Sequence, residues 1–260
     1  MVEIIEKLGP FKIIRIWFHY ENRPDCTLLR LMRQNSSVNS RWAVNEKSYT
    51  VMSDLSIEEE SILNASRKTV RNEIHRAQND GLEISFYNAE KFRNNIDLVD
   101  EFEAAYYRFA EELNNDVVTK AYNRKKIDQY IRNKCFMLTE AKRENLAVYH
   151  AYVYDEKEAV LIYSVSDFRD ESIDKNLAGR ANKYLHYCDM LMFKRHLLKN
   201  YDWGNISDPD NLNGIDNFKL SFGGKMTEKY NVLIGCNFVG KLFIWLYRNR
   251  RMMVEGKNKG

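Results

Sequence analysis

The stretch that decides the fold runs from residue 179 to residue 230 and reads GRANKYLHYCDMLMFKRHLLKNYDWGNISDPDNLNGIDNFKLSFGGKMTEKY. Its pattern predicts a long amphipathic helix, a short strand ending in Asp-Trp-Gly, a polar loop and a second helix that carries Asn-Phe-Lys. Phe-Gly-Gly and a new strand follow. We expect the functional site to be assembled on this stretch, with a sheet beneath it and a wall beside it.

The residues upstream predict that sheet. Three strand-like runs, at 135–141, 146–155 and 159–168, are separated by the charged turns KREN and EKE, which favours an antiparallel meander. Earlier strands are expected at 11–20 and 82–87. Helices are expected from about 57 to 80 (begun by a capping box of Ser56 and Glu59), at 90–113, at 121–134 and at 238–253. This order predicts an α+β, or mixed α/β, fold whose helices cover a mostly antiparallel central sheet.

Composition narrows the class of protein. The 260 residues carry 40 Lys and Arg against 37 Asp and Glu, so the charge balance does not demand nucleic acid, and we expect no DNA partner. The four cysteines stand singly, without CxxC or paired histidines at metal spacing, which predicts reduced thiols and no metal site. Acidic residues within the first apolar run argue against a signal peptide, and no window has the length of a membrane span. We therefore expect a cytoplasmic protein.

The same pass predicts three segments. Residues 1–55 form an N-terminal strand extension packed on the core, residues 56–237 form the main domain, and residues 238–260 form a basic amphipathic helix with a frayed tail.

Two motifs resemble one family. Asp202-Trp203-Gly204 followed by Phe218-Lys219-Leu220-Ser221-Phe222-Gly223 is similar to the D-x-G and F-K-x-x-F-G blocks of the Fem-type branch of the GNAT acyltransferase superfamily. The basic run at 66–77, followed by Gly81, resembles the helix that precedes the transferase core in that family. The resemblance covers roughly residues 50–235 and implies a GNAT-like acyl-CoA N-acyltransferase fold. Aminoacyl-tRNA-dependent Fem enzymes are longer and contain two such domains, whereas this chain has room for one complete domain.

The resemblance implies an N-acyltransferase that moves an acyl or aminoacyl group from a carrier to an amine of a cell-envelope sugar or polysaccharide precursor. Acyl-CoA is the favoured donor, used as a co-substrate rather than a tightly bound cofactor, and the acceptor is a nucleotide-activated or lipid-linked sugar. Two alternatives remain open. One is a tRNA-dependent aminoacyltransferase of the peptidoglycan-bridge type, and the other is a non-catalytic ligand-binding module of transferase fold.

A candidate donor site lies at residues 176–182, which match the superfamily's Gln/Arg-x-x-Gly-x-Gly/Ala pattern except for Asn at its first position. A helix start with close backbone approach favours a phosphate. We therefore expect the donor to be bound by Gly179, Arg180, Ala181 and Asn182. The alternative is that Gly and Ala only begin a packed helix.

The candidate catalytic residues are Lys219 and Asp202. By the resemblance, Lys219, held between Phe218 and Phe222, stabilises developing negative charge. Asp202 either accepts the amine proton or caps the turn that follows it. The resemblance also implies substrate binding by Phe218, Phe222, Lys68 and Arg71.

Other polar features receive structural interpretations. His186 and His196 have no ligand spacing and are expected to be structural. His150 is expected to be a hydrogen-bonded strand histidine, and the alternative is a general base. The helix at 238–253 combines Trp and Tyr with Arg. It is expected to pack on the sheet or on a second subunit, and contact with an anionic membrane surface is the alternative. The oligomeric state is left open.

Overall fold

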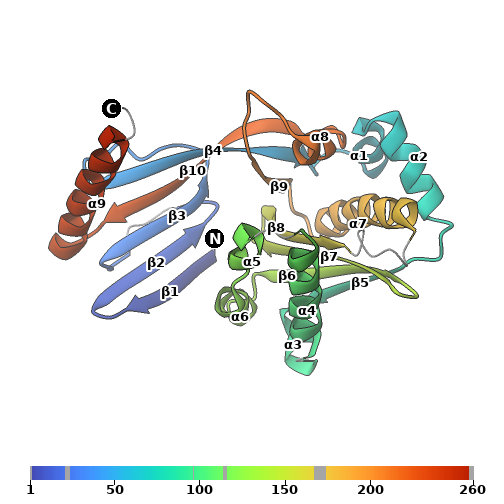
Figure 1. The fold of residues 1–260 in the computed structure, drawn as a ribbon, viewed down its shortest axis with the longest axis horizontal. Helices are drawn as coiled ribbons and strands as arrows, with labels where there is room; N and C mark the ends of the chain where they lie inside the picture. Colours follow the sequence, from blue (N-terminus) through green and yellow to red (C-terminus); the bar gives the residue numbers. More distant parts are fainter. Residues whose placement is uncertain (1, 21–23, 96, 114–115, 167–173, 258–260) are drawn as a thin grey trace. The chain divides into compact units, whose positions relative to one another are not determined.

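The computed structural model describes residues 2–20, 24–95, 97–113, 116–166 and 174–257 (Figure 1). The chain forms two compact units, one from residues 1–50 with 227–260 and one from residues 51–226. The segment boundaries expected at residues 55 and 237 stay a prediction.

The first unit is built on the strands in the order β1-β2-β3-β10-β4. Strand β1 pairs with β2 antiparallel, β2 pairs with β3 parallel, and β3 pairs with β10 antiparallel. Buried branched side chains, among them Ile14, Leu29 and Val232, form its core. The bounds of these elements are β1 (Val2–Leu8), β2 (Phe11–Trp17), β3 (Leu28–Gln34), β4 (Ala43–Asp54), β10 (Lys225–Gly235) and the C-terminal helix α9 (Phe238–Lys257).

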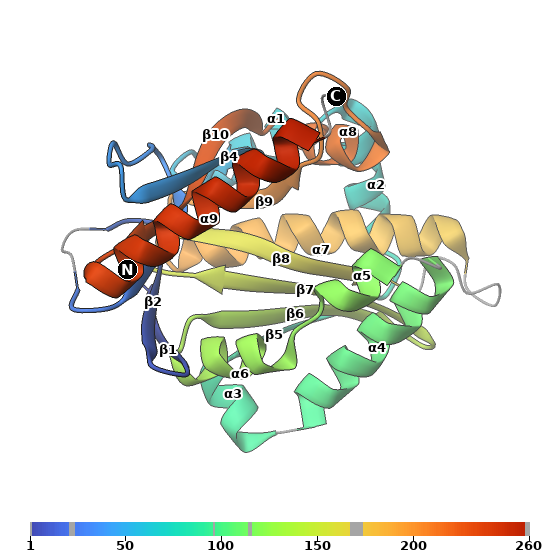
Figure 2. The same cartoon turned by 60° about the vertical axis from the view of Figure 1, so that its left-hand side comes forward.

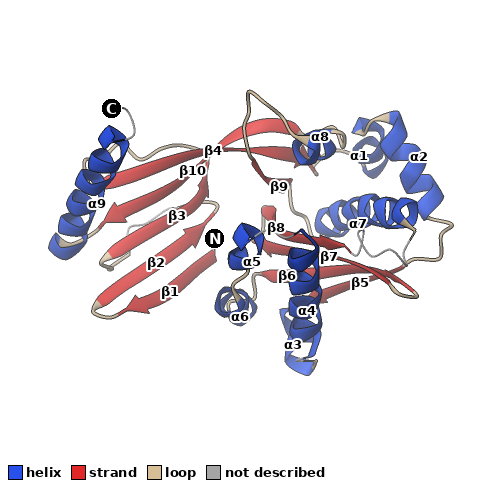
Figure 3. Ribbon diagram, in the orientation of Figure 1, coloured by secondary structure: helices blue, strands red, loops and turns tan. Residues whose placement is uncertain are grey.

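The second unit carries the predicted meander. Its strands lie in the order β9-β8-β7-β6-β5, coloured red in Figure 3. The ladders from β5 to β8 are antiparallel, and β8 pairs with β9 parallel. The α+β class with a mostly antiparallel sheet is therefore confirmed. The bounds are β5 (Glu83–Asn88), β6 (Phe136–Arg143), β7 (Leu146–Tyr154), β8 (Glu158–Ser166) and β9 (Asn200–Ile206).

Helices cover both faces of this sheet, because side chains alternate along each strand. Val148 packs with the long helix α7, whereas its neighbour Tyr149 packs on Phe102 of α4. Figure 2 shows α7 behind the strands and α4 in front of them. The bounds are α1 (Glu59–Ala65), α2 (Lys68–Ala77), α3 (Ala89–Asn94), α4 (Asp97–Leu113), α5 (Asp116–Ala121), α6 (Arg124–Arg132), α7 (Lys175–Arg195) and α8 (Gly214–Leu220).

The prediction of a single helix from about 57 to 80 is wrong. The segment forms two helices, α1 and α2, divided at Ser66, whose backbone is extended with ψ 151°. The predicted capping box does not form, because the Ser56 hydroxyl donates to Asp54 Oδ1 at 2.6 Å. The helix expected at 90–113 is likewise divided into α3 and α4.

No helix among the described residues is long and apolar enough to cross a membrane.

Candidate functional site

The site begins where β8 and β9 stop pairing. Their parallel ladder runs from Glu158 with Asn200 to Val160 with Asp202 and ends there. Immediately afterwards β8 contains a bulge, since Ala151 and Tyr152 of β7 pair with Tyr163 and Leu161 and skip one residue. Beyond Val160 and Asp202 the register between β8 and β9 is not continued.

The Asp-Trp-Gly motif makes the bend in β9 at this point. Asp202 is fully buried, and its Oδ1 accepts a hydrogen bond from the Gly204 N–H at 2.9 Å. Gly204 has φ +81°, and a Cβ there would lie 3.1 Å from the Leu161 carbonyl oxygen. The motif therefore needs glycine, and Asp202 fixes the turn. A catalytic role for Asp202 stays a prediction.

The Phe-Lys block lies on α8, whose start is fixed by its own side chains. The Asn213 side chain accepts from the Ile215 and Asp216 N–H groups, and the Asp216 carboxylate accepts from the Asn213 N–H, which completes a capping box. At the other end, Gly223 has φ +81°, and a Cβ there would collide with the Ala65 carbonyl. The final glycine of the block thus lets α8 end directly against α1.

Lys219 points back to β9. Its Nζ donates to the Asn205 carbonyl at 2.5 Å, and Asn205 is exposed just beyond the point where the strands stop pairing. The neighbouring rings of Phe218 and Phe222 lie 5.3 Å apart, and Phe222 is buried against Trp203. The fold therefore brings Lys219 and its two phenylalanines against the second half of β9, next to Trp203 and Asn205.

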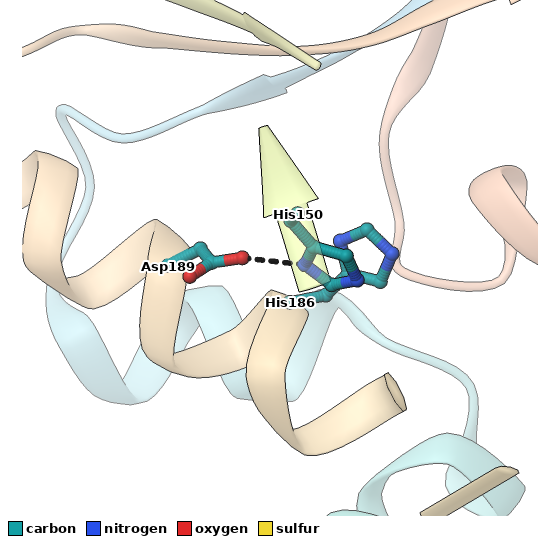
Figure 4. A group of neighbouring side chains, drawn as sticks. All are labelled: His150, His186 and Asp189. Carbon is teal, nitrogen blue, oxygen red and sulfur yellow. Dashed lines mark hydrogen bonds and ion pairs between the residues drawn. The ribbon is translucent and has the colours of Figure 1, made fainter. Parts of the chain in front are cut away.

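A buried polar network lies beneath this aromatic group, and Figure 4 shows its centre. His150 Nδ1 is 2.7 Å from Asp189 Oδ2, which also accepts from the Tyr152 hydroxyl at 2.6 Å. The Tyr152 hydroxyl also hydrogen-bonds the Tyr201 hydroxyl, which in turn lies 2.8 Å from His186 Nδ1. All five side chains are almost completely buried.

Burial sets the charges in the network. It lowers the pKa of His186 well below the ordinary histidine value, and the nearby His150 and Lys219 lower it further. Burial also raises the pKa of Tyr152 and Tyr201 well above the ordinary tyrosine value. His186 and both tyrosines are therefore neutral at physiological pH.

The network also contains a group of potential metal ligands, since ligand atoms of His150, His186 and Asp189 lie within 4.8 Å of one another. The geometry favours hydrogen bonding over metal binding. The two imidazoles are stacked with centroids 3.8 Å apart, so their in-plane lone pairs run side by side and do not converge. His150 Nδ1 is moreover already bonded to the carboxylate.

The structure places the expected donor-binding residues in the second turn of α7 and not at its start. Helix α7 begins at Lys175, so Gly179 stands in its second turn, where a Cβ would meet only Lys183 Nζ at 4.0 Å. The Asp174 side chain caps the helix by accepting from the Asn176 N–H at 2.9 Å. A phosphate at this helix start would meet that carboxylate, which weighs against the expected cradle.

The other expected donor ligands have protein partners. Arg180 Nε pairs with Asp80 Oδ2 at 2.7 Å, which raises the pKa of the guanidinium. Asn182 Oδ1 lies 2.8 Å from His150 Nε2 and so belongs to the buried network. Ala181 is buried against the sheet. Donor binding by these residues stays a prediction, and their contacts give each of them a structural role.

The two basic residues of α2 have different environments. Lys68 is exposed, whereas Arg71 Nη1 donates to the Ser66 and Asn64 carbonyls at the end of α1. Arg71 thus closes the break between the two helices, a contact that the predicted continuous helix did not contain. Substrate binding by either residue stays a prediction.

The sequence alone does not predict the buried network or one nearby cation. The contact of His150 with His186 and Asp189 joins β7 to α7, and residues of these two elements show no spacing relationship in the sequence. Lys183, one turn after Gly179 on α7, lies with its Nζ 5.8 Å from the Phe218 ring centre and pairs with Glu73 at 2.7 Å. It adds a second cation beside the Phe-Lys block.

No protein-family model and no curated protein sequence matches the chain. Solved structures do. The C-terminal domain of a protein named as a lysylphosphatidylglycerol synthetase, from Agrobacterium fabrum, aligns with TM-score 0.58 and 12% identity over 94% of this chain and 83% of that one. FemX aligns with TM-score 0.59 and 10% identity over 88% and 83%. L-PGS from Bacillus licheniformis aligns with TM-score 0.50 and 12% identity over 95% and 84%.

At these identities the likeness is one of fold. It confirms the structural part of the resemblance predicted from the Asp-Trp-Gly and Phe-Lys blocks, because the chain shares the fold of FemX.

Proposed function

We propose that the chain is an acyltransferase that moves an aminoacyl group from a charged tRNA to an amine of a cell-envelope precursor. The observation that carries this proposal is the end of the β8–β9 ladder, with Lys219 bonded to the Asn205 carbonyl just beyond it. In an acyltransferase of this fold, the donor lies where two neighbouring strands separate, and a nearby cation stabilises the oxyanion.

The choice of donor rests on two further points. The start of α7, where the pyrophosphate of a CoA ester is expected in this superfamily, is capped by the Asp174 carboxylate. One fold neighbour is named as a synthetase of lysylphosphatidylglycerol, an aminoacylated lipid, and another is FemX. Both points favour the tRNA-dependent alternative over an acyl-CoA donor.

The proposed reaction balances without an outside reactant. The neutral amine attacks the carbonyl carbon of the aminoacyl ester, so that a C–N bond forms and the C–O bond to the tRNA ribose breaks. The amine loses one proton and the ribose oxygen gains one. Lys219 holds the charge of the tetrahedral oxyanion between these two steps, in a place where the half-buried Phe218 limits access of water.

The test offers the protein both donors in parallel. Total tRNA charged with radiolabelled amino acids, and a radiolabelled acyl-CoA, are each incubated with the protein and a bacterial envelope-precursor extract. Label should pass from tRNA into the extract in a ribonuclease-sensitive reaction. Transfer from the CoA ester alone would overturn the tRNA donor. Saturable precursor binding without transfer from either donor would identify a non-catalytic binding module instead.

A further inference from the structure

Helix α9 presents an apolar face to solvent. Seven large apolar side chains on it are exposed. Five of these fall on one side of the helix, because they are spaced three, four and seven residues apart. Their exposed fractions are 81% for Phe238, 49% for Val239, 47% for Leu242, and 54% for both Trp245 and Leu246. A contiguous exposed face of this kind marks a binding surface.

The opposite side of α9 is already used. Ile244 is fully buried in a cluster with Ile13 and Leu28 of the first unit. Gly240 is buried so tightly that a Cβ would collide with the Thr27 carbonyl. Because the sheet of the first unit takes this side, the exposed face is not the core-facing side of the helix.

Cations border the exposed face. Lys241 and Arg248 fall on one edge of it and Arg250 on the other, by their positions along the helix. The sequence from residue 229 to residue 254 contains no Asp or Glu. Within α9 itself, the surface is therefore apolar at its centre and positive at its margins.

We propose that this face of α9 lies on an anionic lipid bilayer surface. The apolar side chains enter the boundary between headgroups and acyl chains, Trp245 sits at that boundary, and the flanking cations pair with anionic headgroups. The helix lies in the membrane plane, because the sheet of its own unit holds the other side.

Charge complementarity selects the bilayer over a second copy of the chain. Two copies that met through this face would bring two sets of Lys241, Arg248 and Arg250 together without acidic partners on α9 itself. An anionic bilayer supplies the opposite charge over the whole patch. The proposal is independent of the transferase reaction, since it uses no residue of the candidate site.

The experiment measures co-sedimentation of the full chain with two vesicle preparations, phosphatidylcholine alone and phosphatidylcholine mixed with phosphatidylglycerol. Binding should be confined to the anionic vesicles and should weaken at high salt. The double variant Leu242→Gln with Trp245→Gln should weaken binding by more than about tenfold. Arg250→Gln should weaken it about fivefold.

The matched control is Leu8→Gln, which removes a leucine that is even more exposed, 67% accessible, from the end of β1 in the same unit. It should bind vesicles like the unchanged protein. Trp245 gives a second readout, because vesicle binding should shift tryptophan emission to the blue, and Trp245→Phe should abolish the shift while most of the binding persists. Circular dichroism checks that every variant is folded.

Three outcomes would overturn the proposal. The first is equal binding to neutral and anionic vesicles. The second is vesicle binding that the double variant leaves unchanged. The third is a lipid-free dimer, seen by sedimentation velocity, that the double variant separates into monomers, because the face would then be an interface between copies of the chain.

Discussion

His150 Nδ1 and Asp189 Oδ2 lie 2.7 Å apart, and both side chains are completely buried. The carboxylate of α7 is thereby joined to the imidazole of β7, and the Tyr152 hydroxyl donates to the same oxygen. A buried charge of this kind is tolerated only with its partners in place.

We therefore expect Asp189→Ala to lower the free energy of unfolding by about 3 to 5 kcal/mol, because it removes the shared acceptor of two buried hydrogen bonds. Urea denaturation measures the change. The control is Asp128→Ala, which removes the exposed end of an ion pair with Arg124 and should cost less than about 1 kcal/mol. Equal losses of unfolding free energy in the two variants would show that the buried His150–Asp189 bond stabilises the fold no more than a surface ion pair.

Two glycines of the candidate site should respond in opposite directions to alanine. Gly204→Ala should destabilise the protein by about 1 to 3 kcal/mol, because φ is +81° and the new Cβ would press on the Leu161 carbonyl. Gly179→Ala should stabilise it by about 0.5 to 1 kcal/mol, since the position is helical and has space. Thermal unfolding of both variants measures the signs. A large loss on Gly179→Ala would restore the need for glycine at the start of α7.

Features of the fold that depend on neighbouring residues could be predicted from the sequence. Periodicity predicted the meander and α7, because strand alternation and helical spacing are local signals. The Asp-Trp-Gly turn is also predictable from the sequence, since an Asp side chain can accept from the backbone N–H two residues further on. The fold resemblance rested on motifs of this local kind.

Contacts between residues that are distant in the sequence could not be predicted from it. At the break between α1 and α2, Arg71 donates a hydrogen bond to the Ser66 carbonyl. Gly223, which is distant in the sequence, packs against the Ala65 carbonyl without room for a Cβ. The Asp174 carboxylate caps the helix start where a phosphate was expected. The pairing of His150 with Asp189 arises only when β7 and α7 pack together.

Stability should fall in mild acid because of His186. Burial holds its folded-state pKa well below the unfolded value of about 6.5, so below that pH the unfolded chain takes up a proton that the folded chain does not. The stability lost through His186 therefore grows as the pH falls below about 6.5.

Urea denaturation across this pH range, for the unchanged protein and His186→Gln, isolates that contribution as a difference in slope. The exposed His196, changed to Gln, is the control and should leave the slope unchanged. If His186→Gln retained the full acid sensitivity, the loss would belong to other groups.

Removing Arg71 and removing Lys68 from α2 should have different effects on stability. Arg71→Ala should cost about 1 to 2 kcal/mol of unfolding free energy, because two carbonyls at the end of α1 lose a charged donor. Lys68→Ala should stay within about 0.5 kcal/mol, as surface substitutions do. Chemical denaturation compares them. If Lys68→Ala alone weakened acceptor binding in the transfer assay, the predicted substrate role would belong to Lys68 and not to Arg71.

Lys219 is the residue on which the proposed reaction depends most. Lys219→Ala should lower kcat by about a hundredfold to a thousandfold, because the oxyanion loses its cation, while the lost bond to the Asn205 carbonyl costs only about 0.5 to 1.5 kcal/mol of stability. Lys219→Arg keeps the charge and should retain part of the activity. Lys125→Ala, on the exposed side of α6, is the control for removal of a lysine. Single-turnover transfer from charged tRNA separates kcat from binding. Unchanged turnover in a folded Lys219→Ala protein would make this lysine structural and would remove the oxyanion step from the proposed mechanism.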